Sequence, residues 1–532
     1  MVMSNGSVHP PRRSSLSGAV GANWLGYLVF LVSGFVLPRL IGDLAGQELL
    51  GIWDFAWSTI NFTNWLQFGI FSAVGRDVAR FRVAEDWTSV SRSLSASLVM
   101  LLLAFGGGLI LISALVYATP LLLPAATDPQ VVRETRWVVG ILGVNAAVGL
   151  PLGVFTGVLV GLERWDLKNL TRSVPELACL AAMAMLLLGG HGLVALAWAT
   201  LAAEITADLW AFWCVRRLCP ELRIARRLVT WEALSDVLSF GGRSYLHGIA
   251  RGGLYHVNSL IVTACMGPAA VAVFGRQRSL VVSFQKLIRQ YGNVFTPPSA
   301  ALLASGDRDG LRELALRSGL YGMYLALPIV VVLTLAGGPL VRLWMGSAYE
   351  APMVLAVLAL GHACSFAHHG TYSILVGMNR HGWVAVAEIC CAVLATVAAY
   401  VLVGHLHWGL LGAAVAIAVA LTLGAGVVPI VLLCRALRIP LAGFLWKTTR
   451  GPLLSLLPLA ASLLAAQAVL GRGTTASLAA GLGAGGTLLA AIYWRWVLPA
   501  PLKRRLLKKL GLAGPAKPQT SVRTVEGLGV HT

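Results

Sequence analysis

The sequence predicts an all-α polytopic membrane protein with about fourteen transmembrane helices. Of its 532 residues, 57% are hydrophobic and only 12% are charged, whereas soluble domains carry roughly 25% charged residues. Spanning a bilayer takes about 20 consecutive apolar residues, and about fourteen runs meet that criterion. These runs lie near residues 17–38, 49–72, 94–116, 137–160, 173–190, 192–214, 236–264, 269–295, 316–337, 352–376, 382–404, 408–434, 452–470 and 476–498.

The placement of lysine and arginine predicts which side of the membrane each loop faces, because cytoplasmic loops carry an excess of these residues. With the N-terminus in the cytoplasm, 30 of the 41 Lys and Arg residues fall in inner loops and tails and five fall in outer loops. We therefore expect both termini to be cytoplasmic. The net charge of +19 is attributed to this topology and to contact with anionic membrane lipids, and no nucleic acid partner is expected.

An internal repeat divides the predicted helices into two six-helix lobes. Val158–Leu167 resembles Ile374–Trp383, 216 residues further on, and the segment from Gly46 weakly resembles the one from Gly267. Repeats of the same orientation are related by a pseudo-two-fold axis along the membrane normal, with a cavity between them. The predicted parts are a cytoplasmic tail (1–16), an N-terminal lobe (17–215), a basic linker (216–235), a C-terminal lobe (236–434), two extra helices (435–498) and a basic cytoplasmic tail (499–532).

Six basic residues remain, and all of them fall inside the seventh and eighth predicted spans. An arginine at the bilayer centre costs about 2.5–3.5 kcal/mol on insertion scales, so intramembrane cations indicate a function. At a rise of 1.5 Å per residue, two of them, Arg251 and Arg278, lie near the midplane. The six residues are Arg243, Arg251, Arg276, Arg278, Lys286 and Arg289.

These cations form two predicted stripes. Arg243, His247 and Arg251 follow one another at intervals of four residues and share a helix face. Arg278 and Arg289 are about three turns apart, with Lys286 beside their line, while Arg276 points away and is expected to pair or to reach outward. Facing each other, the stripes would form a cationic ladder suited to a phosphate or diphosphate group, which arginine binds through a planar fork of donors.

Simpler interpretations of the same residues remain open. Lys286 and Arg289 could extend their charged ends to the inner surface, and His247 could be a packed polar residue. Arg251 and Arg278 could form buried ion pairs. The acids available for such pairs are Glu204, Asp208 and Glu388.

A second polar stripe runs along the second predicted span. It consists of Asp54, Asn61 and Asn64. These side chains could hold a coupling cation or proton, or contact sugar hydroxyls, or simply make hydrogen bonds between helices.

Nothing in the sequence indicates an enzyme. The longest outer loop, Ala118–Arg136, has neither a pair of catalytic carboxylates nor a Ser/His/Asp arrangement. No phosphate-binding glycine loop is present, and the eight cysteines show no metal-ligand spacing. We therefore expect no catalytic residue, no cofactor and no metal.

Several local motifs resemble one family, in the family's order and over nearly the whole chain. They are FVLPRLIGDLAGQELLGIWDFAWS (Phe35–Ser58), AVGRDVARF (Ala73–Phe81), FTGVLVGLERWDLKNL (Phe155–Leu170), FGRQRSL (Phe274–Leu280) and FTPPSAALLA (Phe295–Ala304). In these motifs the chain resembles a polysaccharide (O-antigen-type) lipid flippase of the multidrug/oligosaccharidyl-lipid/polysaccharide (MOP) exporter superfamily.

The resemblance implies a function in polysaccharide or lipopolysaccharide biosynthesis. Members of the family move a polyprenyl-phosphate- or diphosphate-linked oligosaccharide from the inner to the outer leaflet of the bacterial cytoplasmic membrane by alternating access. Expected partners are that lipid-linked glycan, membrane lipids, a polysaccharide polymerase and glycosyltransferases. The alternative is a drug/cation antiporter of the same superfamily, which needs an acidic cavity and fits six intramembrane basic residues poorly.

Overall fold

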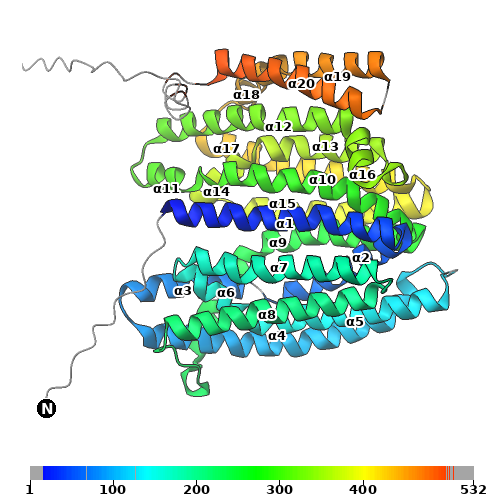
Figure 1. The fold of residues 1–532 in the computed structure, drawn as a ribbon. Helices are drawn as coiled ribbons and strands as arrows, with labels where there is room; N and C mark the ends of the chain where they lie inside the picture. The colour runs from blue at the N-terminus through cyan, green and yellow to red at the C-terminus, as the bar shows by residue number, and fades with distance from the viewer. Residues whose placement is uncertain are drawn as a thin grey trace, which may run out of the picture. The chain divides into compact units, whose positions relative to one another are not determined.

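The computed structural model describes residues 16–67, 69–125, 127–471, 473–498, 500, 503 and 507, with the side chains of 16–23, 240–247 and 249–251 left out. Within these ranges the chain is almost entirely helical and contains no β-strand (Figure 1). The predicted all-α class is therefore confirmed. The chain divides into two compact units, Met1–Leu453 and Leu454–Thr532, and each is described by itself.

The first half of the larger unit is built from eight α-helices and two short 3₁₀ segments. They are α1 (Leu16–Leu44), α2 (Gln47–Ile60), η1 (Asn61–Gln67), α3 (Ile70–Val83), α4 (Trp87–Leu122), α5 (Pro129–Leu152), α6 (Val154–Gly161), α7 (Trp165–Leu188), α8 (Leu193–Leu218) and η2 (Arg226–Leu228). Local sequence explains where several begin. Asp86 and Asp128 cap α4 and α5 by accepting from the backbone N–H of Ser89 and Gln130.

The second half of that unit follows the same plan. Its helices are α9 (Trp231–Met266), α10 (Pro268–Asn293), α11 (Thr296–Ala304), α12 (Arg308–Met345), η3 (Ser347–Tyr349), α13 (Pro352–Ala367), α14 (His369–Gly377), α15 (Gly382–Ala399), η4 (Tyr400–His405), α16 (Gly409–Ala420), η5 (Leu421–Val427), α17 (Val428–Leu437) and α18 (Leu441–Ser455). Proline at the first position of α10 and α13 favours their starts, because its fixed backbone angle suits a helix N-terminus.

The two halves share unusual backbone conformations at corresponding places. Gly46 and Gly267, which precede α2 and α10, have φ of 95° and 86°. Only glycine adopts such angles without strain. Glu163 and Asn379, which are 216 residues apart, follow α6 and α14 in left-handed conformations, with φ of 58° and 55°. These pairs lie where the internal repeat places equivalent residues, and the division into two six-helix lobes remains a prediction.

Eleven helices of the described part are long and apolar enough to cross a membrane, so the chain is a multi-pass membrane protein. Three further predicted spans, near 49–72, 236–264 and 269–295, coincide with α2–α3, α9 and α10 and are not among the eleven. These three carry the intramembrane charges singled out from the sequence, which lower their mean hydropathy. The count of fourteen spans remains a prediction.

The packing of the larger unit brings α1, α2 and α9 to the junction between its two halves. Helix α1 packs against α7 and α2 and also touches α12, and it runs between α7 and α10 in Figure 1. Helix α2 packs against both α5 and α10. Helix α9 contacts α3 and α4 of the first half as well as α15 and α16 of the second. These three helices therefore connect the halves.

The smaller unit contains α19 (Leu457–Leu470), α20 (Thr475–Ile492) and the π-helical turn η6 (Tyr493–Val497). Helices α19 and α20 pack against each other, with Gly485 seated against Leu459.

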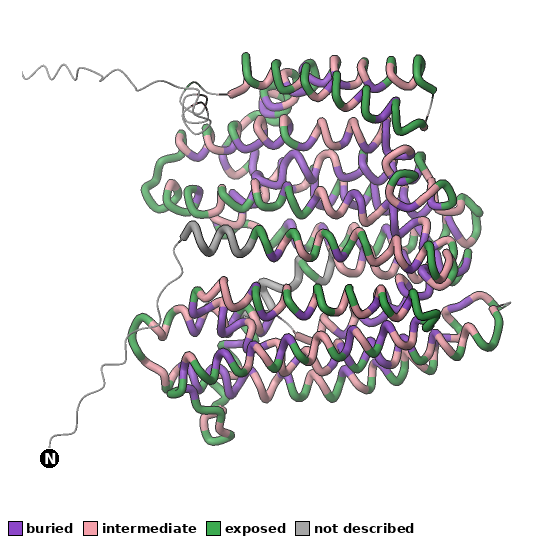
Figure 2. Tube along the Cα trace, in the orientation of Figure 1, coloured by how far each residue is buried: buried purple, intermediate pink, exposed green. Residues whose placement is uncertain are grey.

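Exposed residues, green in Figure 2, lie along many helices of the chain, and many of them have large apolar side chains. Leu103 and Ile110 of α4 and Met185 and Leu188 of α7 are each more than 65% exposed. A soluble protein would bury such residues, whereas lipid solvates them. The exposed apolar faces therefore fit a bilayer environment.

Candidate functional site

The first half of the larger unit encloses a cavity of about 830 Å³. Its size lies toward the upper end of the roughly 300–1,000 Å³ typical of small-molecule sites. The lining residues come from α1, α2, η1, α3, α5, α6, α7 and α8. Those with chemistry to offer are Phe30, Trp57, Asn64, Phe71, Ser72, Arg76, Asn145, Thr156, Lys168, Arg172, Glu204 and Asp208.

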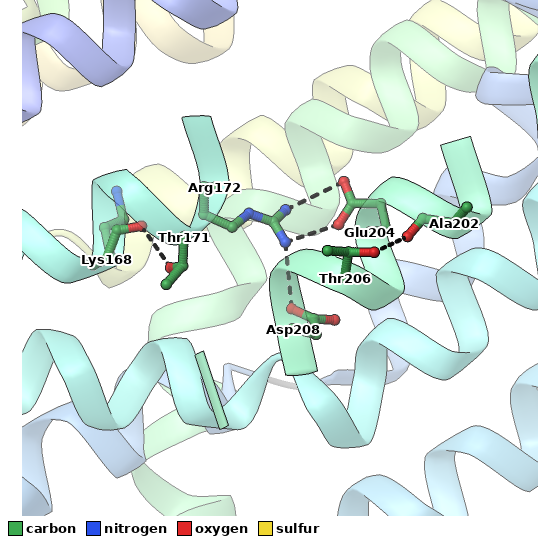
Figure 3. Close-up of polar contacts among 7 residues, drawn as sticks. All are labelled: Lys168, Thr171, Arg172, Ala202, Glu204, Thr206 and Asp208. Carbon is green, nitrogen blue, oxygen red and sulfur yellow. Dashed lines mark hydrogen bonds and ion pairs between the residues drawn. The ribbon is translucent and has the colours of Figure 1, made fainter. Parts of the chain in front are cut away.

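An ion-pair cluster on α7 and α8 forms one wall of this cavity (Figure 3). Arg172 donates from Nη1 to Glu204 Oε2 at 2.8 Å and to Asp208 Oδ1 at 3.4 Å. It donates from Nη2 to Glu204 Oε1 at 3.4 Å. Arg172 and Glu204 are about one-third exposed to the cavity, whereas the Asp208 side chain is only 3% exposed.

Helix periodicity places these charges on facing surfaces. Lys168, Arg172 and Glu176 are spaced by four residues along α7, and Glu204 and Asp208 by four along α8. Residues four apart lie on one helix face, and α7 packs directly against α8. The result is a row of two cations and then a carboxylate on α7, which begins beside Trp165 and lies against two carboxylates of α8.

The rest of the cavity wall combines aromatic rings with polar groups. Phe30, Trp57 and Phe71 present apolar surface, and Arg76, which is ion-paired with Asp77 at 2.6 Å, adds a further cation. Asn145 is only 7% exposed, and its Oδ1 has no hydrogen-bond partner among the described atoms. Buried polar groups are nearly always satisfied, so Asn145 is available to a bound molecule.

The described side chains of the predicted cationic ladder do not line this cavity. The side chains of Arg243, His247 and Arg251 lie outside those that the structure describes. Arg278 is described, and it donates to the Tyr255 carbonyl at 2.9 Å and to Ser259 Oγ at 2.6 Å. It therefore does not pair with Glu204 or Asp208, which hold Arg172 instead.

The other predicted cations also lie apart from the cavity wall. Lys286 is exposed and lines a separate space of about 190 Å³ between α1, α10 and α12. Arg289 lies on the exposed side of α10. Of the three described members of the ladder, Arg278, Lys286 and Arg289, none lines the 830 Å³ cavity.

The predicted polar stripe of the second span is split between two environments. Asp54 accepts from Arg276 Nη2 at 2.7 and 2.6 Å, so the expectation that Arg276 would pair is met. Asn61 donates to the Trp57 carbonyl, and Asn64 donates to Asn61 Oδ1 at 3.3 Å. Only Asn64 of the three stripe residues lines the large cavity.

Sequence reasoning assigned the cavity charges to other tasks. Lys168 and Arg172 are among the 30 basic residues that the sequence assigns to inner loops and tails, and Glu204 and Asp208 are among the possible partners of Arg251 and Arg278. The signal that could have found the cluster is the pair of four-residue spacings on successive helices: Lys168 with Arg172, and Glu204 with Asp208.

Comparisons with known proteins bear on the class of protein. Residues 166–354 match the pattern of a family described as "Polysaccharide biosynthesis protein". The uncharacterized membrane protein EpsK of Bacillus subtilis (strain 168) is 23% identical over 42% of this chain and 45% of its own length, so the chain spans less than half of that relative. A Shigella flexneri protein named "Putative O-antigen transporter" is 21% identical over 75% of this chain and 94% of its own length.

Solved structures share the fold. An inward-facing multidrug resistance MATE family transporter of the MOP superfamily superposes with a TM-score of 0.67 at 17% identity, over 80% of this chain and 98% of that one. An outward-facing transporter of the same family gives a TM-score of 0.56 at 16% identity, over 81% and 97%. A MOP superfamily transporter from Pyrococcus furiosus also gives 0.56 at 16% identity, over 81% of this chain and 97% of that one.

The described part of the chain is a multi-pass membrane protein, and the relatives and solved structures that it resembles include proteins named as transporters. The predicted resemblance is confirmed: the chain has the fold of the MOP superfamily and matches the pattern of the polysaccharide biosynthesis proteins over residues 166–354.

Proposed function

We propose that the chain moves a lipid-linked, anionic oligosaccharide across the bacterial cytoplasmic membrane, from the inner to the outer leaflet, by alternating access. The observation that carries this proposal is the composition of the large cavity. Three cations and two carboxylates line it, giving a net charge of +1, and three aromatic rings lie beside them. Cations suit a phosphate or diphosphate headgroup, and aromatic faces with polar groups between them suit sugar rings.

The drug/cation antiporter is the second candidate, because Glu204 and Asp208 line the same cavity. Both carboxylates are already engaged by Arg172, and Lys168 and Arg76 add further positive charge. A cationic drug would therefore find both cavity carboxylates occupied and two further cations beside them, which disfavours its entry. The Shigella flexneri relative, an O-antigen transporter by its printed name, also supports a glycan cargo.

The ends at which the helices meet support a proposal for the side to which the cavity opens. The superposition is better with the inward-facing structure, 0.67 against 0.56. Helices α2 and α10 meet near their first residues, where Gln47 donates to the Ala269 carbonyl at 3.3 Å. On the predicted topology, with both termini in the cytoplasm, these ends face outward. We therefore propose that the cavity is open to the inner leaflet in this arrangement.

The predicted ladder on α9 remains part of the proposal as a second wall of the pathway. Trp65 of η1 packs against α9 at Gly252, where an added Cβ would lie 3.1 Å from Trp65 Nε1. Asn64, the preceding residue, lines the cavity. Arg251 is therefore the neighbour of a residue, Gly252, that packs against the cavity wall. We propose its side chain for headgroup contact, together with Arg243 and His247 earlier on the same helix.

Surface display of polysaccharide in cells tests the proposal. We expect Lys168→Met and Arg251→Gln each to lower the surface glycan by about tenfold or more, because a charged hydrogen bond is worth about 1.5–3 kcal/mol. Lys447→Met is the matched control, since Lys447 is an exposed cation of α18 away from the cavity. Immunoblots of membranes check that each variant is present. Normal glycan in both test variants would refute the site.

A further inference from the structure

The charged groups of this α7–α8 cluster carry one excess negative charge, and an anionic headgroup would add to it. Two cations, Lys168 and Arg172, stand beside three carboxylates, Glu176, Glu204 and Asp208. Glu176 joins the cluster through a small adjoining space of about 20 Å³ that Arg172 and Glu204 also line. A diphosphate adds roughly two further negative charges. Uncompensated charge in a half-buried site is costly, so the ion pairs or the protonation of the cluster must change when the headgroup binds.

Arg172 is the group whose partners can change. Its guanidinium now serves both Glu204 and Asp208, and its longer contacts, at 3.4 Å, are weak ones. It is also about 30% exposed to the cavity. A phosphate accepts two parallel hydrogen bonds from the same fork and would compete directly with the carboxylates for the Nη atoms.

We propose that Arg172 exchanges partners during binding: a phosphate or diphosphate headgroup takes its guanidinium from Glu204 and Asp208, and this carboxylate pair then takes up a proton. The proton comes from a hydronium ion of the cavity water: its O–H bond breaks, an O–H bond forms on a carboxylate oxygen, and a neutral water molecule remains. The inference rests on the proposed function, since it takes the lipid-linked headgroup as the ligand of this cavity.

The surroundings of Glu204 and Asp208 favour a proton over a metal cation. The charged and titratable groups that face the pair are Lys168, Arg172, Glu176 and Cys179 of α7 and Arg76 of α3. Helices α1, α5 and α6 contribute Phe30, Asn145 and Thr156, which carry no charge. Three nearby cations repel a metal ion, whereas a proton is held covalently and removes the negative charge at its source.

A second observation indicates a ligand in the same cavity. Asn145 lines the cavity and is only 7% exposed. Its Oδ1 has no hydrogen-bond partner among the described atoms. It comes from α5, which packs directly against α8. A ligand hydroxyl would satisfy this acceptor while its anionic group holds Arg172.

Titration calorimetry on the purified full-length protein tests the exchange. The probe is geranylgeranyl diphosphate, a short polyprenyl diphosphate, injected at pH 7.5 in two buffers of different ionisation enthalpy. The second phosphate pKa is about 6, so the probe itself takes up no proton on binding. We expect an uptake of about one proton per bound probe in the wild type. The double variant Glu204→Gln/Asp208→Asn should bind without uptake.

Asp309→Asn is the matched control, because Asp309 is an exposed carboxylate of α12, 89% accessible, and the uptake should persist in it. If the double variant fails to fold, the wild type alone still decides the outcome. Its affinity for the probe must rise as the pH falls, since binding that takes up protons is tighter where protons are abundant.

Two results contradict the exchange while sparing the proposed function: wild-type binding with no proton uptake, or an affinity that does not change with pH. Uptake that persists in the double variant also contradicts it. A wild type that binds tetraphenylphosphonium with release of protons, and does not bind the diphosphate, overturns the proposed function itself in favour of the cation antiporter.

Discussion

The Asp54–Arg276 ion pair joins α2 to α10 through two side chains that are 14% and 3% exposed. Arg276 also lies over the Trp344 ring, with its Cζ 5.9 Å from the ring centre. Removing one member of a buried pair leaves the other charge uncompensated, whereas replacing both members is often close to neutral. Losing one member of the pair is therefore expected to cost more stability than losing both.

This asymmetry gives a residue-scale prediction. Arg276→Gln should destabilise the protein by about 3–5 kcal/mol, because it leaves Asp54 charged and unpaired. Adding Asp54→Asn should recover most of that loss. The measurement is the midpoint of thermal unfolding in one detergent for the wild type, both single variants and the double variant. A double variant that is less stable than Arg276→Gln would show that the contact is not a buried ion pair.

The sequence predicts the environment of a residue where its position on one helix determines that environment. It does not predict contacts that depend on how two helices pack together. The helix face of Arg276 follows from its spacing to Arg278, so its separate environment was foreseeable. The choice of Arg172 as partner for Glu204 and Asp208 depends on how α7 and α8 pack. Arg251 and Arg278 are equally compatible partners by the sequence alone, which contains no distances between helices.

At the scale of elements, the contact between α2 and α10 is unusually close. A Cβ added at Gly51 would lie 1.8 Å from the carbonyl oxygen of Pro268, so only glycine permits this approach. Gly275 faces Asp54 in the same way, with an added Cβ 2.6 Å from Oδ2. In an alternating-access cycle this seam must separate whenever the cavity opens to the outer leaflet.

Gly51→Ala should therefore shift the equilibrium toward the state with the seam open. Overpacking costs about 1–3 kcal/mol, and each 1.4 kcal/mol is worth about a factor of ten in population. Ala272 shares a face of α10 with Pro268 and Arg276 and is fully buried, so Ala272→Cys should react with a membrane-impermeant maleimide only when the seam opens. We expect faster labelling with Gly51→Ala.

Gly107→Ala is the control for that experiment, because nothing lies within 4 Å of an added Cβ there. The protein that retains Ala272 gives the background labelling of the native cysteines, and this background is subtracted. Equal labelling in the Gly51→Ala and Gly107→Ala proteins would mean that the seam does not gate the cavity.

The elements themselves were largely predictable, and their interruptions were less so. Long apolar runs between charged loops predict helices at α4, α7, α8 and α12, because no other structure satisfies the backbone inside a bilayer. The break between α13 and α14 at His368 follows no proline or glycine. It depends on how these two short helices pack against α12 and α10, which the local sequence does not contain.

For the whole molecule, the charge of the proposed cargo would set the direction of transport. Moving one charge through 100 mV is worth about 2.3 kcal/mol, and an inside-negative potential pushes anions outward. A headgroup with roughly two negative charges would gain about 4–5 kcal/mol. If the proton taken up by Glu204 and Asp208 is released on the outer side together with the headgroup, the net charge moved is about one and the gain falls to about half, which still favours export. The membrane potential alone is therefore a sufficient driving force on this account.

Flipping in proteoliposomes measures the proposed export of the lipid-linked oligosaccharide itself. A fluorescent polyprenyl-diphosphate-linked oligosaccharide is placed in the inner leaflet, and a membrane-impermeant quencher outside reports its arrival in the outer leaflet. We predict that the wild type flips the lipid faster than protein-free liposomes do, that an inside-negative valinomycin potential accelerates the process, and that Lys168→Met slows it by about tenfold. A wild-type rate equal to that of protein-free liposomes, with or without the potential, would contradict the account.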